Sequence, residues 1–319
     1  MINRITGLAL PLLCLAACTS AIRNEDKDPA TETAATTAPA AETPAKRLER
    51  PGNTSLVAGN EADLPGYWVG MFEPDTDAGH VSAGEGFHWD YANKINIVIE
   101  KADHGVVTGH SVVAGNDRPF EGTVVLKEGR YIFALKEPGD DKYDGVFSFS
   151  VAQGDSVVSG TWEAYKKIRI PRRKFELTKT LFRYNPELMP DYRRYVDWNK
   201  KGKRIEYELD EDVTEYDYSY FTTTDEVSRY NASTRLLTAA EVSNMTKADL
   251  FVLRNTIYAR HGYSFRNQQL RAYFDVQPWY VPVSNDVKSE FTETEKKNIQ
   301  LLLRYEKNAR EYYDVFGRG

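Results

Sequence analysis

Eight short runs of alternating apolar residues constrain the fold of this chain more than any other feature. Ile95, Ile97 and Ile99 are one such set, and each is separated from the next by a single residue. The runs cover residues 64–72, 95–99, 106–113, 120–126, 131–135, 146–151, 157–165 and 174–177. Turn-forming clusters such as 114–117 and 138–141 separate them. This even spacing predicts an antiparallel β meander, which hides its edges best by closing into a small barrel or a tight sandwich.

Two aromatic sequences mark the ends of the predicted meander. Gly66-Tyr67-Trp68 lies near its start and Gly160-Thr161-Trp162 near its end. The arrangement resembles lipocalins at the level of topology, which implies a barrel of eight strands with room for an internal cavity. A barrel of about eight strands is equally well filled by its own side chains. A carrier of a small apolar ligand and a packed β core therefore both stay open.

The C-terminal part carries residues that are typical of helix starts and helix ends. Thr238, Thr246 and Thr292 each precede a carboxylate by three residues, the arrangement that satisfies free amides at a helix start. Gly262 follows the second of these helices as a left-handed stop. Together with the β meander, this pattern predicts an α+β protein with segregated domains, in which a small helical domain comes last.

Charged residues fall on the helix faces that should be buried. Glu295 and Glu306 share a face of the last helix with Ile299 and Leu302, and a buried carboxylate needs a partner. We expect a structural clamp in which these carboxylates satisfy the cations of the preceding helix. Its members are Arg254, Tyr258, Arg260, His261, Gly262, Glu295 and Glu306. The alternative is an anion-binding cluster formed by the arginines and the histidine at the helix end.

The same segment carries a family resemblance. The sequence Arg254-Asn255-x-Ile257-Tyr258-Ala259-Arg260-His261-Gly262-Tyr263-x-Phe265 is followed by Trp279-Tyr280 and Glu295-x-x-Asn298-Ile299. This pattern resembles the YARHG domain over roughly Leu237 to Tyr313. The resemblance implies a small helical extracytoplasmic module of bacterial lipoproteins and implies no catalytic residue. Trp279 and Tyr280 remain as a predicted binding surface, because aromatic rings stack on sugars.

The first residues predict a membrane anchor. A short basic start is followed by the apolar run Ile5–Leu15, which is too short to span a bilayer, and by Ala16-Ala17-Cys18. Residues 1–18 resemble a bacterial lipoprotein signal, which implies lipid on Cys18; an ordinary secretory peptide is the alternative. Thr19 in place of Asp implies the outer membrane in proteobacterial sorting, on either the periplasmic or the cell-surface face.

The remaining chain divides by composition. Residues 19–60 are rich in Ala, Thr, Pro and Glu and predict a disordered tether, residues 61–180 the β domain, and residues 236–319 the helical domain. Residues 181–235 are dense in tyrosine and charge. They are interpreted either as a connection that packs aromatic rings between the two domains or as a carbohydrate- or peptide-binding surface.

The net charge and the absence of known cofactor and metal-binding motifs in the sequence reduce the number of functional classes that this chain fits. The 319-residue chain has a net charge of −6, which argues against nucleic acid as a partner. His80, Glu85 and His88 do not have metal-ligand spacing, no cofactor motif is present, and no catalytic residue is predicted. We expect a non-catalytic binding or scaffolding protein of the cell envelope, with peptidoglycan or another envelope protein as its partner. The rival hypotheses are the apolar-ligand carrier and a hydrolase of envelope polymers.

Overall fold

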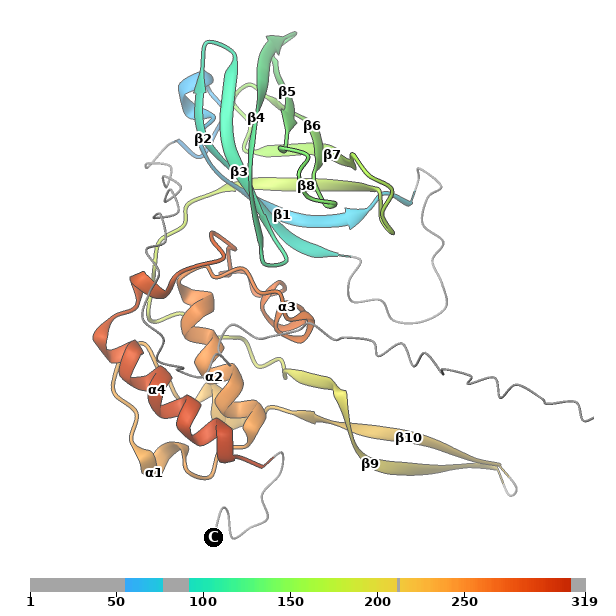
Figure 1. The fold of residues 1–319 in the computed structure, drawn as a ribbon, viewed down its shortest axis with the longest axis vertical. Coiled ribbons are helices and arrows are strands. Elements are labelled where there is room, and N and C mark those ends of the chain that lie inside the picture. The colour runs from blue at the N-terminus through green and yellow to red at the C-terminus, as the bar shows by residue number, and fades with distance from the viewer. Residues whose placement is uncertain (1–54, 77–91, 211–212, 311–319) are drawn as a thin grey trace, which may run out of the picture. The chain divides into compact units, whose positions relative to one another are not determined.

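The computed structural model describes residues 55–76, 92–210 and 213–310. They form an eight-stranded antiparallel closed barrel followed by a small helical region, as predicted (Figure 1). The barrel strands are β1 (Gly66–Pro74), β2 (Asn93–Asp103), β3 (Val106–Val113), β4 (Asn116–Lys127), β5 (Arg130–Lys136), β6 (Gly145–Ala152), β7 (Val157–Ala164) and β8 (Arg172–Thr180). Each strand pairs with the next, and β1 pairs with β8 to close the barrel.

Three of the barrel hairpins turn on a residue followed by glycine. These pairs are His104–Gly105, Ala114–Gly115 and Glu128–Gly129, and φ is positive at all six residues. Two consecutive residues with positive φ give a turn whose twist matches that of the flanking strands. The turn clusters seen in the sequence therefore act by setting the register of β2–β3, β3–β4 and β4–β5.

Large side chains fill the barrel interior. The strand β5 alternates strictly between exposed and buried residues, as expected for a strand with one face toward a core. The core includes Trp68, Phe133, Phe147, Phe149 and Phe175, and the rings of Phe133 and Phe149 stack at 4.4 Å. The packing of these rings favours the filled barrel over the apolar-ligand carrier.

The helical region is built from α1 (Ala239–Val242), α2 (Lys247–Arg260), α3 (Gln268–Phe274) and α4 (Glu293–Asn308). Short 3-10 turns lie at Glu61–Asp63, Asp225–Ser228 and Lys288–Glu290. All three predicted threonine caps are present, each within a complete capping box. Gly262 ends α2 with φ of 76°. No helix among the described residues is long and apolar enough to cross a membrane.

The connection between barrel and helices contains two strands that the sequence reading did not predict. Strands β9 (Val196–Asp210) and β10 (Val213–Thr222) form an antiparallel hairpin, called the arm below. Its base is joined by hydrogen bonds from Tyr195 N to Thr223 Oγ1 and from Thr223 N to Tyr195 O, both 3.1 Å. The interpretation that the tyrosines of this segment pack between the domains is wrong for the arm, whose tyrosines are exposed.

The barrel and the helical region lie within one compact unit of the chain and share a polar contact. Lys94 on β2 donates from Nζ to the carbonyl oxygens of Gln277 and Tyr280, at 2.8 and 2.9 Å. Its backbone N–H donates to Asp275 Oδ2 at 2.9 Å. Burial lowers the pKa of Lys94 to about 8 and raises the pKa of Asp275 to about 6. Lys94 is therefore charged below about pH 8 and Asp275 above about pH 6, so the two groups are charged together only between these values.

Candidate functional site

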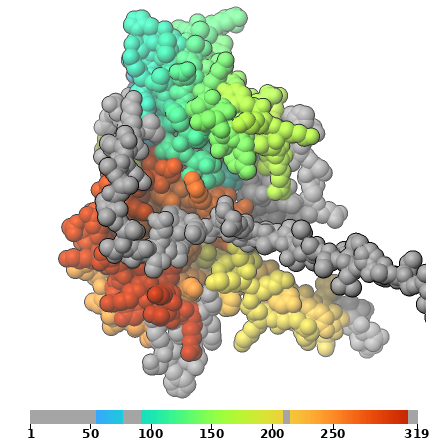
Figure 2. Space-filling model, viewed as in Figure 1, coloured from blue at the N-terminus to red at the C-terminus, as the bar shows by residue number. Residues whose placement is uncertain are grey.

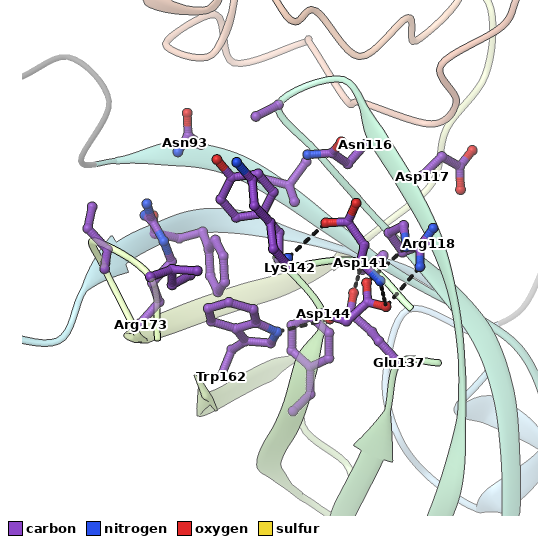
Figure 3. Close-up of a pocket in the computed structure, with 18 of the residues that line it drawn as sticks. Asn93, Asn116, Asp117, Arg118, Glu137, Asp141, Lys142, Asp144, Trp162 and Arg173 are labelled. Atoms are coloured by element: carbon purple, nitrogen blue, oxygen red, sulfur yellow. Dashed lines mark hydrogen bonds and ion pairs between the residues drawn. The ribbon is translucent and has the colours of Figure 1, made fainter. Parts of the chain in front are cut away.

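The candidate site is a cavity of about 820 Å³ at one end of the barrel (Figure 3). This end, called the mouth, is where β1, β3, β5 and β7 finish and where β2, β4, β6 and β8 begin. Arg266, Arg271 and Asn285 of the helical region also line the cavity. The site thus draws its side chains from strand ends and loops that are far apart in the sequence.

The floor of the mouth is aromatic and contains one buried carboxylate. The rings of Phe72 and Trp162 meet edge to face at 5.7 Å. Glu137 accepts hydrogen bonds from Ser111 Oγ at 2.8 Å, from Gly145 N at 2.8 Å and from Trp162 Nε1 at 3.1 Å. Burial raises the pKa of Glu137, although these three donors oppose the shift. Glu137 therefore links the strands at the floor of the mouth through hydrogen bonds, and its carboxylate is not a free group.

The wall of the mouth contains a fork-shaped ion pair. Arg118 donates from Nε and Nη2 to the two carboxylate oxygens of Asp144, at 2.9 and 2.8 Å (Figure 3). Its Nη2 also donates to Asp140. Asp144 is 1% exposed, and it also accepts from the backbone of Gly139 and Asp141. Burial opposes its ionisation, but Arg118 and these amides hold the pKa of Asp144 below its usual range. The pair fixes the β6 end of the mouth.

Positive side chains outnumber negative ones around the cavity. Seven lining residues are Lys or Arg and four are Asp or Glu, although the whole chain has a net charge of −6. The cations are Arg118, Lys142, Lys167, Arg169, Arg173, Arg266 and Arg271. Lys142 and Lys167 are exposed, and the guanidinium of Arg173 lies 5.0 Å above the ring of Phe72. The mouth is therefore electrostatically suited to an anion.

One polar atom of the mouth is left unsatisfied within the described part of the chain. Asn93 at the start of β2 is 6% exposed, and its Oδ1 atom has no hydrogen-bond partner there. A buried amide oxygen without a partner costs free energy that a ligand N–H or O–H would recover. Asp117 is different, because its Oδ1 lies 2.6 Å from His110 Nδ1.

Sequence reasoning did not find the mouth. Its chemistry comes from the ends of several strands and from loops, and such residues share no spacing in the sequence. The cluster 138–141 has only the composition of a turn. A detectable signal was the basic and apolar segment Lys166 to Arg173 beside the aromatic Trp162, which lies at the same end of the barrel.

The structure brings together two pairs of the predicted clamp. Arg254 donates from Nε and Nη2 to Glu306, at 2.9 and 3.2 Å, and its guanidinium lies over the ring of Phe251. His261 Nε2 lies 2.9 Å from Glu295 Oε2. Tyr258 packs edge to face on Phe291 at 4.8 Å.

Arg260 does not follow the predicted pairing with a glutamate. It donates from Nε to the Leu188 carbonyl at 2.7 Å and from Nη1 to Ser233 Oγ at 3.0 Å. The residues of the 181–235 connection thus satisfy this guanidinium. Arg254, Arg260 and His261 are 1%, 2% and 4% exposed, which argues against the alternative of an anion-binding cluster.

The predicted binding surface at Trp279 and Tyr280 is wrong for Tyr280. Tyr280 is 1% exposed, and its hydroxyl donates to the Tyr263 carbonyl at 2.6 Å. Trp279 is half-buried, and its Nε1 donates to the Met189 carbonyl at 3.0 Å. Both rings are used inside the helical region, so they do not form an exposed platform.

Several residues weighed from the sequence fall outside the described part of the chain. They are Cys18 with its signal, His80, Glu85 and His88. Among the described residues, no group of three or more His, Cys, Asp or Glu side chains is placed to hold a metal ion.

A family model, the YARHG domain, matches residues 225–307. The match begins ahead of Leu237, where the resemblance was expected to start, and it includes the 3-10 turn at Asp225–Ser228. Comparison with curated proteins and with solved structures returns no significant match. The chain carries a YARHG domain, placed C-terminal to an eight-stranded barrel.

Proposed function

We propose that this protein is a lipid-anchored component of a bacterial outer membrane that binds an anionic ligand of the cell envelope at the barrel mouth, without catalysis. The excess of cations around the mouth, in a chain of net negative charge, carries this proposal. A fragment of peptidoglycan fits this chemistry. Its sugars would contact the exposed ring of Tyr143 in the lining of the mouth, and the carboxylates of its peptide would pair with lysine and arginine.

The rival functions are less well supported by the same site. The barrel core is packed with aromatic rings, so an apolar ligand inside it would have to displace Phe133, Phe147 or Phe149. For a hydrolase, an acid and a base would have to be free to act. Asp144 is instead held by Arg118, and Glu137 by three hydrogen-bond donors.

Ligand binding is expected to depend on the exposed lysines of the mouth. Replacing Lys142 and Lys167 together by glutamate reverses two charges in the cavity without touching the barrel core. We expect affinity for peptidoglycan to fall by about tenfold or more, because like charges then face the ligand carboxylates. The measurement is the fraction of full-length chain that sediments with purified peptidoglycan across a concentration series.

The matched control reverses two lysines at the opposite end of the barrel. Lys101 and Lys127 are exposed and lie near the ends of β2 and β4 that point away from the mouth. Their replacement by glutamate makes the same change in net charge and is expected to leave binding within about twofold. Equal losses in the two variants, or no sedimentation of the unaltered chain, would contradict binding at the mouth.

The anchor is tested by its cysteine. The chain has two cysteines, Cys14 and Cys18, and the proposal assigns the lipid to Cys18. Replacing Cys18 by serine is expected to abolish the incorporation of labelled fatty acid into the chain, because the proposed acyl chains are attached to this residue. Replacing Cys14 by serine should leave this labelling unchanged. Labelling of the Cys18 variant equal to that of the unaltered chain, measured on the immunoprecipitated protein, would refute the assignment.

A further inference from the structure

The arm formed by β9 and β10 is not used by the proposed binding site. Its strands pair only with each other among the described residues, and a two-stranded hairpin alone is marginally stable in water. The exposed fractions of Tyr207, Tyr216, Tyr218 and Tyr220 are 47%, 53%, 37% and 41%. Figure 2 shows the arm, in yellow, open on the side of the molecule that is drawn. The arm therefore offers aromatic area and a free strand edge to a partner.

One face of the arm carries a row of tyrosines. Directly paired residues share a face of a sheet, and Tyr216 pairs with Glu206 while Tyr218 pairs with Arg204. Tyr220 lies two residues further along the same face. The guanidinium of Arg204 lies 3.9 Å from the ring centre of Tyr216. Aromatic and cationic side chains thus alternate along this face.

The charges of the arm change sign along its length. Residues 200–204, nearer the base, contain four Lys or Arg and no acid, whereas the described residues 206–208 and 214–217, farther from the base, contain four Asp or Glu and no base. On the tyrosine face, the order from base to tip is Lys201, Arg204, Glu206 and Glu208. If a second arm lay antiparallel on this face, its acids would therefore face these cations and its cations would face these acids.

We propose that the tyrosine face of the arm docks on the same face of a second copy of this chain, with the two arms antiparallel about a two-fold axis. In this arrangement, Lys201 and Arg204 of each copy lie opposite Glu208 and Glu206 of the other. A two-fold interface requires a self-complementary patch, and this charge order supplies one. Lys201 and Glu208 are about 23 Å apart along an extended strand, which sets the length of the contact.

The ion pair already present within the arm does not prevent this docking. Arg204 Nη2 lies 2.8 Å from Glu206 Oε1, and the two side chains are 52% and 59% exposed. Exposed pairs of this kind contribute little and exchange partners readily. The carboxylates of Glu206, Glu208, Glu215 and Asp217 also make an anionic lipid surface an unsuitable occupant, because like charges repel.

The proposal is tested with charge-reversal variants of the full-length chain, each made with two different tags so that association between copies can be measured. The unaltered forms are expected to co-purify, with a two-copy species in native mass spectrometry. The double variant Lys201→Glu with Arg204→Glu makes this face entirely acidic, and Glu206→Lys with Glu208→Lys makes it entirely basic. Each variant is expected to associate with itself about tenfold less than the unaltered chain. Mixing the two variants is expected to restore association, which a mere folding defect would not do.

The Lys101→Glu and Lys127→Glu double variant is the control for net charge and should associate as the unaltered chain does. A monomeric unaltered chain would overturn the proposal, as would self-association that survives both charge reversals. Failure of the mixed variants to associate would also overturn it, because the charge pairing between copies would then be absent. None of these outcomes depends on peptidoglycan, so they are independent of the test of the barrel mouth.

Discussion

Replacing Arg254 by alanine is expected to lower the free energy of unfolding by about 3–5 kcal/mol. Arg254 is 1% exposed and donates two hydrogen bonds to Glu306, whose side chain is 15% exposed. The alanine variant leaves this carboxylate beside an apolar core without its main cation. The destabilisation should appear as a lower midpoint in urea, followed by the fluorescence of the tryptophans.

Arg235 provides a matched control for Arg254. It makes a comparable fork with Glu241, but both side chains are largely at the surface, with exposed fractions of 49% and 25%. The Arg235→Ala variant is expected to lose at most about 1 kcal/mol. Replacing both Arg254 and Glu306 by leucine should recover much of the loss, because no charge is then left unpaired. An unchanged urea midpoint for Arg254→Ala would contradict the clamp and would favour the anion-binding alternative.

Replacing Glu295 by alanine is expected to cost about 3–5 kcal/mol as well, because its carboxylate joins three elements. Glu295 is 0% exposed. It accepts from Tyr184 Oη at 3.0 Å, from Thr292 N at 2.9 Å and from Thr292 Oγ1 at 3.2 Å, and it faces His261. The substitution removes the cap of α4 and leaves the imidazole and the phenol without their shared acceptor.

The same carboxylate makes stability depend on pH. Burial opposes its ionisation, but hydrogen bonds, foremost the one from His261, hold the pKa of Glu295 below its ordinary value in the folded protein. A lowered pKa means that the stabilisation is fully present above the ordinary carboxyl pKa of about 4.3 and is lost as the pH falls through the folded value. Glu295→Gln should remove this acid-dependent part while keeping the shape of the side chain. The urea midpoint should fall less between pH 7 and pH 3 in Glu295→Gln than in the unaltered chain. An equal fall in the two proteins would contradict the role of Glu295 in this pH dependence.

The strand and helix positions could be predicted because each depends on residues that are neighbours in the chain. The alternating run around Ile95–Ile99 became β2, and Thr246 with Asp249 became the cap of α2. The arm was missed for the same reason. Tyrosines alternate in β10, but most other positions of both strands are charged or polar, so no alternation of aliphatic residues marks the two strands.

The roles of individual side chains were harder to predict than their elements. The helical face correctly brought Arg254 toward Glu306, since both positions lie on regular helices. Arg260 instead donates hydrogen bonds to Leu188 and Ser233. Both residues belong to an irregular connection whose path cannot be predicted from a sequence pattern. An aromatic pair such as Trp279-Tyr280 suits a sugar-binding surface, but the hydroxyl of Tyr280 donates to the Tyr263 carbonyl inside the core.

The sequence by itself determined a β meander followed by capped helices and a YARHG domain, because alternation, turn residues and caps act over a few positions. Only the tertiary structure decided that the meander closes, that its interior is filled, and that cations collect at one end. Closure depends on the pairing of β1 with β8, about a hundred residues apart in the chain. The mouth depends on strand ends that become neighbours only once the barrel has closed, which is why its charge could not be predicted from spacing.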